Sequence, residues 1–232
     1  GSFGDGYWSL LVFTMQMVLM IVTGYAVAIS PPVDRFITWL ASLPRTGRGA
    51  IALIAAMTML VSFVGWAMSL IFGGLFVRAC ARRSELKMDY RAAGAAAYLG
   101  LGATWALGIS SSAAQLQANP ASLPKSILPI TGVIPLTETI FLPQSMMMAA
   151  IIFLFTLTIS YLSAPSRDHS VTAEALGVDL AKPEMDDTPR SRPGEWLEYS
   201  PLVTLILVGM ALLWFAREFQ TRSALTVVSN LN

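Results

Sequence analysis

This 232-residue sequence has few charges, one cysteine and one histidine. Charged residues make up 12% of it, about half the share of about 25% found in a soluble globular domain, while hydrophobic residues make up 55%. The net charge of +1 gives no electrostatic basis for binding nucleic acid. The single cysteine, Cys80, excludes an intrachain disulfide, and the single histidine, His169, leaves little for a histidine-rich metal site. Sparse charge between long uncharged stretches indicates an integral membrane protein.

Four apolar stretches are long enough to cross a bilayer, which takes about 20 residues in a helix. They are residues 7–30, 92–117, 145–164 and 199–216. The first begins with Tyr7 and Trp8, side chains that suit the headgroup level, and Pro31 and Pro32 follow its end. We therefore predict an all-α integral membrane protein in which residues 31–49 lie at the membrane interface.

A fifth apolar stretch, residues 50–77, is too long for one upright span, because such a helix measures roughly 40 Å and the hydrocarbon core about 30 Å. Basic residues flank it on both sides: Arg35, Arg45, Arg48, Arg78, Arg82, Arg83, Lys87 and Arg91. The positive-inside tendency places both flanks in the cytoplasm, which a single crossing cannot do. We predict a re-entrant helical hairpin with its tip at residues 64–66; one long tilted helix is the alternative.

With both flanks of the hairpin in the cytoplasm, each remaining segment can be assigned to one side of the membrane. Residues 118–144 hold one lysine, Lys125, and no arginine, as expected of an external loop. Residues 165–198 are polar and carry acidic and basic side chains, which favours a solvated cytoplasmic linker. Residues 1–164 then form one membrane domain, and residues 199–232 contain a last span and the lead into another apolar segment. We expect the chain to be a fragment whose second half follows.

The span at residues 92–117 contains a polar interruption, in which Ser110, Ser111 and Ser112 follow Gly108. Neighbouring residues of a helix are about 100° apart, so three serines in a row suit an unwound turn better than one helix face. Hydroxyls also supply partners to the backbone groups that a break frees, and the second half-helix presents N–H groups with a partial positive charge. These features predict a carboxylate site at mid-depth in the membrane.

No Lys, Arg, Asp or Glu occurs in residues 7–32, 50–77 or 92–124, so an anion at mid-depth would be met by dipoles and hydroxyls. Two alternatives stay open: a regular helix whose serines bond to carbonyls four residues back, or a span that ends at Leu107 with the serines in the external loop. The residues predicted to bind substrate are Ser110, Ser111, Ser112, Gly108, Gly65, Trp66, Ser69 and Trp105. The two tryptophans would line an acyl pocket, with plain packing as the alternative.

Four sequence blocks stand in order along the chain: FGDGYWSLLVFTMQMVLMIVTGYAVA, VGWAMSLIFGGLFVRACARR, DYRAAGAAAYLGLGATWALGISSSAAQLQANP and GVIPLTETIF. They resemble consecutive blocks of the bacterial short-chain fatty acid transporter family, whose members carry acetoacetate- or butyrate-type substrates. The resemblance implies the fold of the ion-transporter superfamily, with inverted repeats that each hold a re-entrant hairpin and a broken helix and that work by elevator-like movement. It also implies a homodimer, and that this chain is the first half of its protein.

The chain departs from the family pattern at two places. Where the pattern leads us to expect an Asn-Trp-Gly-like hairpin tip, it has GWA at residues 65–67, and where relatives show a Thr-Pro-Gly turn, it has NPA at residues 119–121. The loss of an amide at the tip changes the polarity expected of the ligand pocket. This change favours a different acid, or a member that transports none.

We predict a multi-pass protein of the bacterial inner membrane that is a secondary active transporter of short-chain fatty acids or other monocarboxylates, as the family resemblance implies. We expect as its partners the carboxylate, membrane lipid and the other half of the same protein, and no cofactor beyond a coupling H+ or Na+. A non-transporting membrane sensor or scaffold, or a transporter of another small organic anion, is the alternative. We expect no enzyme, because a serine hydrolase needs a general base and His169 is predicted on the opposite side of the membrane from the serines.

Overall fold

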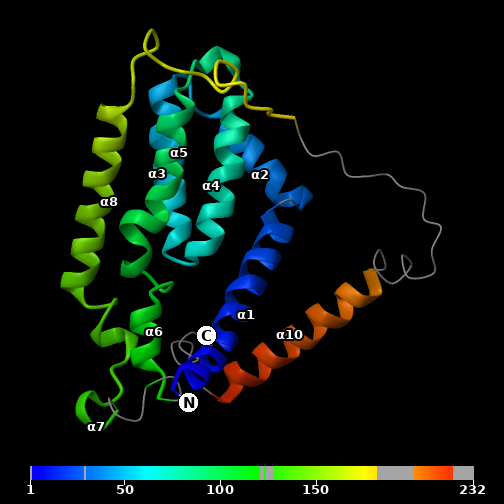
Figure 1. Ribbon diagram of the computed structural model, residues 1–232, viewed down its shortest axis with the longest axis vertical. Coiled ribbons are helices and arrows are strands. Elements are labelled where there is room, and N and C mark those ends of the chain that lie inside the picture. The colour runs from blue at the N-terminus through cyan, green and yellow to red at the C-terminus, as the bar shows by residue number, and fades with distance from the viewer. Residues whose placement is uncertain (1, 29, 121–122, 124–127, 182–200, 222–232) are drawn as a thin grey trace. The chain divides into compact units, whose positions relative to one another are not determined.

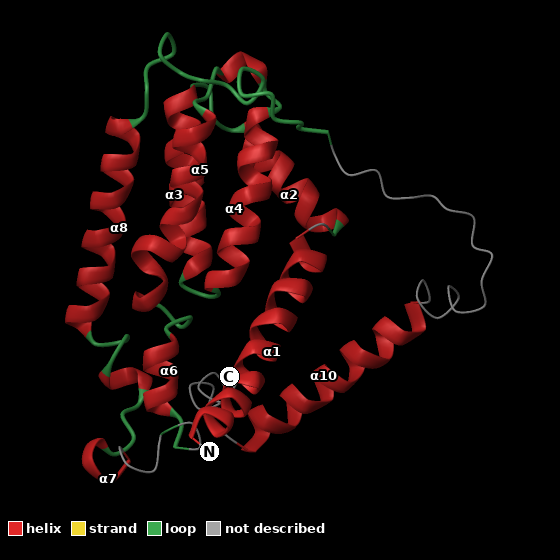
Figure 2. Ribbon diagram, in the orientation of Figure 1, coloured by secondary structure: helices red, strands yellow, loops and turns green. Residues whose placement is uncertain are grey.

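The computed structural model of the chain describes residues 2–28, 30–120, 123, 128–181 and 201–221 (Figure 1). Within these residues all regular structure is helical, as predicted (Figure 2). The helices are α1 (Ser2–Ala28), α2 (Pro31–Ser42), α3 (Gly47–Ser62), α4 (Trp66–Ala81), α5 (Tyr90–Leu99), α6 (Ser112–Ala118), α7 (Leu128–Thr131), α8 (Pro143–Ser163) and α10 (Pro201–Thr221). The chain divides into two compact units, Gly1–Leu180 and Ala181–Asn232, and α10 is the helix described in the second.

Among the described residues, two segments are long and apolar enough to cross a membrane: Tyr90–Ala118, which contains α5 and α6, and Pro143–Ser163, which is α8. The helices α3 and α4 are apolar but shorter. Large apolar side chains on α8 face outward, and Leu154, Phe155 and Leu162 are each more than half exposed. A lipid-facing helix presents such a surface, so the helical structure agrees with the predicted membrane protein.

The stretch predicted as a hairpin forms two antiparallel helices joined by a tight turn (Figure 1). The first helix, α3, ends at Ser62, residues 63–65 make the turn, and α4 begins at Trp66. The last two N–H groups of the turn both donate to the carbonyl of Val61, which closes it. One long tilted helix, the alternative for residues 50–77, is therefore wrong.

Small side chains let α3, α4 and α5 pack closely. A methyl group on Gly73 of α4 would lie 2.9 Å from the Cγ2 of Thr58 in α3 and 3.0 Å from the carbonyl oxygen of Ala97 in α5, so a larger residue would push the helices apart. Buried side chains from the three helices complete the core: Ala50, Ile51, Ile54, Ala55, Met59, Phe72, Phe76, Ala93, Ala96 and Ala97. Close approach through small residues is typical of helix contacts in membranes.

Residues 164–180, here called the strap, cross the end of the hairpin that lies opposite its turn (Figure 1). Asp89, the N-cap of α5, is 2% exposed and accepts hydrogen bonds from the N–H groups of Ala92 (2.9 Å) and Val171 (2.8 Å). The N–H of Tyr90 donates to the carbonyl of Val171 at 2.9 Å. Hairpin arginines donate to strap carbonyls: Arg48 to Ala164, Arg78 to Asp179 and Arg82 to Leu180.

The strap occupies part of the segment predicted as a solvated linker, residues 165–198. The first half of the predicted linker, residues 165–180, is hydrogen-bonded to the rest of the fold. Arg78 and Arg82 donate to its backbone carbonyls, and Asp89, the N-cap of α5, accepts from one of its N–H groups. Residues 182–198 lie outside the described part of the chain.

Candidate functional site

The span predicted to be interrupted at its serines has its break there. After α5 the chain continues as a π-helical turn, Gly100–Thr104, and a 3-10 turn, Trp105–Leu107. Gly108 is extended and α6 starts at Ser112, so residues 105–111 form the break. The break lies level with the hairpin turn, and α6 continues beyond it (Figure 1, Figure 2). A regular helix through the serines, one of the alternatives, is therefore wrong.

Ser110 joins the break to the hairpin turn. Its N–H donates to the carbonyl of Phe63 at 3.2 Å, and its Oγ donates to the carbonyl of Ser62 and, at 3.0 Å, to that of Trp105. Gly108 permits this close approach, because a methyl group there would lie 2.5 Å from both the Cα and the carbonyl oxygen of Phe63. The carbonyls freed at the end of α3 are thus satisfied by a residue from a distant part of the chain.

Further buried hydroxyls form hydrogen bonds within the hairpin and between the hairpin and the segment before the break. The hydroxyls of Ser62 and Thr104 lie 2.7 Å apart and are wholly buried. Buried Ser69 of α4 donates to the carbonyl of Thr58 in α3 at 2.7 Å. Among the described residues, no buried side-chain nitrogen or oxygen lacks a hydrogen-bond partner. Neutral pairs of this kind avoid the cost of desolvating a charge.

The three consecutive serines differ in their surroundings. Ser110 and Ser111 are buried, and the Oγ of Ser111 accepts the N–H of Ala114 at 3.4 Å as the N-cap of α6. Ser112, the first residue of α6, is exposed. Two of the serines therefore hold the break in shape, and the third presents its side chain outward.

A cavity of about 360 Å³ opens beside this joint, between the turn, the break and α8. It is lined by the apolar residues Leu60, Phe63, Val64, Leu107, Gly108, Ile109, Ile140, Phe141, Met146, Ala149, Ala150 and Phe153. Of the residues predicted to bind substrate, Gly108 belongs to this lining, whereas Gly65, Trp66 and Trp105 are half-buried outside it. The volume lies at the lower end of the range of about 300–1,000 Å³ for small-molecule sites.

The helix α8 supplies one side of the cavity, although none of its residues was predicted to bind substrate. Met146, Ala149, Ala150 and Phe153 follow the i, i+3, i+4, i+7 spacing of one helix face. That face is hidden in the sequence, because residues 145–164 are apolar on nearly all sides and no polar stripe marks the rest of the helix. On the other side of the cavity, Phe63, Val64, Leu107 and Ile109 lie in or next to the predicted tip and break, so their position was a usable signal.

The serines have neither a metal cluster nor a histidine beside them in the described part of the chain. No three His, Cys, Asp or Glu side chains gather there closely enough to hold a metal ion. His169 lies in the strap, where its Nδ1 and the Oγ of Ser166 are 2.8 Å apart, at the end of the hairpin opposite the turn (Figure 1). The side chains at the break are held by neutral hydrogen bonds to backbone carbonyls and N–H groups.

Comparison with known proteins gives one consistent result. The family model described as "Short chain fatty acid transporter" matches residues 1–232. An Escherichia coli (strain K12) protein named "Putative short-chain fatty acid transporter" is 32% identical over 233 residues, which cover 99% of this chain and 51% of that protein. A Haemophilus influenzae (strain ATCC 51907 / DSM 11121 / KW20 / Rd) protein of the same name is 36% identical over 142 residues, 60% of this chain and 31% of that protein. No solved structure matches.

The match confirms the resemblance inferred from the four sequence blocks. The family model extends over the whole chain, and the E. coli relative is similar from end to end of it. The chain spans about half the length of this relative. It belongs to the short-chain fatty acid transporter family.

Proposed function

We propose that this chain is part of a secondary active transporter that carries short-chain fatty acids across the bacterial cytoplasmic membrane. Its relatives bear a transporter name, and its described part has apolar helices of membrane length. The proposal includes an H+ or Na+ gradient as the driving force and a second half that completes the site, as the family resemblance implies. The main support for the proposal is the apolar cavity that lies beside the uncharged contact between the α3–α4 turn and the break before α6.

The cavity suits the acyl tail of a short acid. Its lining holds aliphatic and aromatic side chains from the turn, the break and α8, and no Asp, Glu, Lys or Arg. Burying one methylene group in such surroundings contributes about 0.8 kcal/mol, so each added carbon should strengthen binding until the cavity is full. The size of the cavity therefore sets the preferred chain length in this proposal.

In this proposal the carboxylate lies at the break, with the exposed hydroxyl of Ser112 as its donor. Ser110 and Ser111 act indirectly, because their hydroxyls hold the break against the turn and start α6. A neutral site of hydrogen-bond donors binds an anion without a permanently buried charge that would cost free energy when the site is empty. A low free-energy cost of the empty state suits a site that must bind and release substrate in every transport cycle.

The turn and the break would move together during transport. Ser110 bonds to two consecutive carbonyls at the end of α3, and the hydroxyls of Ser62 and Thr104 pair across the same joint. Moving both elements as one body leaves every one of these backbone groups paired, whereas separating them in a lipid environment would cost several kcal/mol per group. This pairing supports the elevator-like movement that the resemblance implies.

The test is uptake of acetate, propionate and butyrate by the full-length protein in proteoliposomes. Ala150 lines the cavity but is exposed, so Ala150→Leu should fill part of the cavity without disturbing the core. We expect a roughly tenfold rise in KM for butyrate, from about 1–3 kcal/mol of overpacking, and a smaller rise for acetate. The loss should therefore grow with the length of the acid.

The matched control is Ala26→Leu, the same change on the exposed side of α1. It should leave the KM for all three acids unchanged. An equal effect of Ala150→Leu on all three acids would place the acyl tail elsewhere, and absence of uptake by the unaltered protein would remove the transport proposal itself.

A further inference from the structure

A second cavity, here called the basic cleft, lies at the base of the hairpin, near the strap. It has a volume of about 280 Å³ and is lined by Arg45, Thr46, Gly47, Arg48, Glu85, Leu86, Lys87, Tyr161, Pro165, Ser166 and Arg167. Four of these residues are cationic and one is acidic. The cleft therefore carries an excess of positive charge, in contrast to the uncharged cavity at the other end of the hairpin.

The positive charge of the basic cleft is not neutralised within the described part of the chain. Glu85 pairs with Arg83, its carboxylate 2.8 Å from the Nε of that arginine. Arg48 uses one N–H to bond the carbonyl of Ala164 and keeps its charge. The side chains of Arg45, Lys87 and Arg167 make no hydrogen bond or ion pair to described residues. Like charges that share a cleft repel one another, and an anion between them relieves that repulsion.

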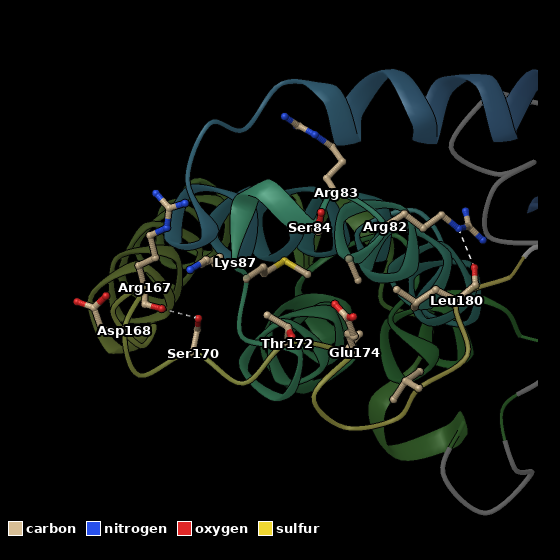
Figure 3. Close-up of a pocket in the computed structure, with 14 residues that line it drawn as sticks. Arg82, Arg83, Ser84, Lys87, Arg167, Asp168, Ser170, Thr172, Glu174 and Leu180 are labelled. Carbon is tan, nitrogen blue, oxygen red and sulfur yellow. Dashed lines mark hydrogen bonds between the residues drawn. The ribbon is translucent and has the colours of Figure 1, made fainter.

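A neighbouring cavity of about 940 Å³ shows on which side the anion would sit. Lys87 and Arg167 line both cavities, but the larger one also contains Asp168 and Glu174. Figure 3 shows the guanidinium groups of Arg82 and Arg83 directed away from the middle of this larger cavity, and Lys87 at the same end as Arg167. Figure 3 also shows the carboxylate of Glu174 toward the middle of the larger cavity and that of Asp168 at its outer edge. Glu174 would repel an anion from the larger cavity, so the basic cleft is the favoured side.

The position of the basic cleft identifies the source of the anion. Tyr161 lies in the last turn of α8, which is long and apolar enough to cross a membrane and ends at Ser163. Tyrosine, lysine and arginine at the end of a span belong to the headgroup level, where anionic lipids attract clustered cations. We propose that the basic cleft binds the headgroup phosphate of an anionic phospholipid of the surrounding membrane.

The experiment uses the full-length protein purified in a neutral detergent. Phosphatidylglycerol is titrated into it while thermal unfolding and the number of bound lipids, by native mass spectrometry, are recorded; phosphatidylcholine and inorganic phosphate are titrated in parallel. We expect stabilisation by phosphatidylglycerol that the other two do not give. Each cation removed should weaken phosphatidylglycerol binding roughly fivefold, so Lys87→Gln with Arg167→Gln should weaken it roughly 25-fold.

The choice of substituted residues and a control variant separate a loss of lipid binding from a loss of folding. Lys87 and Arg167 are exposed, so their replacement should not destabilise the protein in the absence of added lipid, and Arg35→Gln removes one exposed charge of α2 outside the cleft as the control. Lipid binding retained by the double variant would overturn the proposal. Equal stabilisation by inorganic phosphate would overturn the assignment to lipid, and equal stabilisation by phosphatidylcholine would overturn the role of charge.

Discussion

The two ends of the α3–α4 hairpin are joined to the rest of the chain by contacts of opposite chemistry. At the turn, Ser110 bonds to two backbone carbonyls, and the buried hydroxyls of Ser62 and Thr104 pair with each other. At the base, arginines and buried Asp89 bond to the strap, and further cations line the basic cleft. One joint is neutral and the other is charged.

The chemistry of each end limits where that end can lie relative to water. Charged groups need solvent or a partner, and their desolvation is costly, whereas hydroxyl–carbonyl pairs remain favourable in apolar surroundings. The neutral turn therefore suits a position inside the membrane and the charged base a position at its surface. It follows that packing and neutral hydrogen bonds govern the turn, while pH acts on the base.

The largest expected effect comes from separating the turn and the break. Gly108→Ala puts a methyl group 2.5 Å from the Cα and carbonyl oxygen of Phe63, contacts that backbone atoms cannot relieve without moving. We expect destabilisation of about 3 kcal/mol in thermal unfolding of the full-length protein. Gly102→Ala is the control, because its nearest neighbour, Cδ1 of Tyr98, would be 3.6 Å away. Equal effects of the two changes would show that the close approach at the turn does not matter.

The second prediction compares the loss of the buried Ser110 hydroxyl with the loss of the exposed Ser112 hydroxyl. Ser110→Ala leaves a buried carbonyl of α3 without its hydroxyl donor and should cost about 2 kcal/mol of unfolding free energy. Ser112→Ala should change stability by less than about 0.5 kcal/mol, since the side chain is exposed, yet it should reduce uptake. Unfolding and uptake measured on both variants give the comparison. A reversed order of the two stabilities would contradict the roles assigned to these serines.

A third prediction concerns the charged base. Burial raises the pKa of Asp89, but hydrogen bonds from the N–H groups of Val171 and Ala92 and from Arg91 outweigh it, so its pKa is lowered from the ordinary value of 3.8. A lowered pKa contributes stability that is complete above the unfolded-state pKa and is lost as the pH falls through the folded-state pKa. Asp89→Asn should therefore cost about 1.5 kcal/mol at neutral pH.

That cost should shrink as the pH falls below about 4, because the unfolded-state carboxylate then takes up a proton and the folded-state carboxylate does so at still lower pH. Thermal unfolding of both proteins, from neutral pH down to about pH 3, measures the difference. Asp168→Asn, an exposed change in the strap that bonds to Asp89, is the control for the substitution itself. A gap that stays constant over this range would mean that the Asp89 charge contributes nothing.

The smallest expected effect is the coupling across the neutral joint. Ser62→Ala and Thr104→Val each remove one hydroxyl of the buried pair, and the double variant removes both. A double-mutant cycle should give a coupling free energy of about 1 kcal/mol, the usual size for a buried neutral hydrogen bond. The coupling should not vary with pH, in contrast to the effect of Asp89→Asn. Additive single changes would mean that this pair does not hold the joint.

Much of the architecture could be predicted because its signals are local. Basic clusters on both sides of residues 50–77 predicted the reversal of the chain, and the observed turn, residues 63–65, overlaps the predicted tip. Three serines after Gly108 predicted the break for a similar reason, since unwound backbone needs polar partners close by in the sequence. Family membership followed from longer sequence blocks.

Length, hydropathy and flanking charge specify which segments are helical and apolar and where the helices are interrupted, because these signals act over neighbouring residues. The residues that the interruptions contact depend on the three-dimensional fold. It brought Ser110 onto the carbonyls of Ser62 and Phe63, selected one face of α8 to line the cavity, and bonded the strap to Asp89. These contacts join residues far apart in the chain, and close packing of small side chains in three dimensions sets their partners.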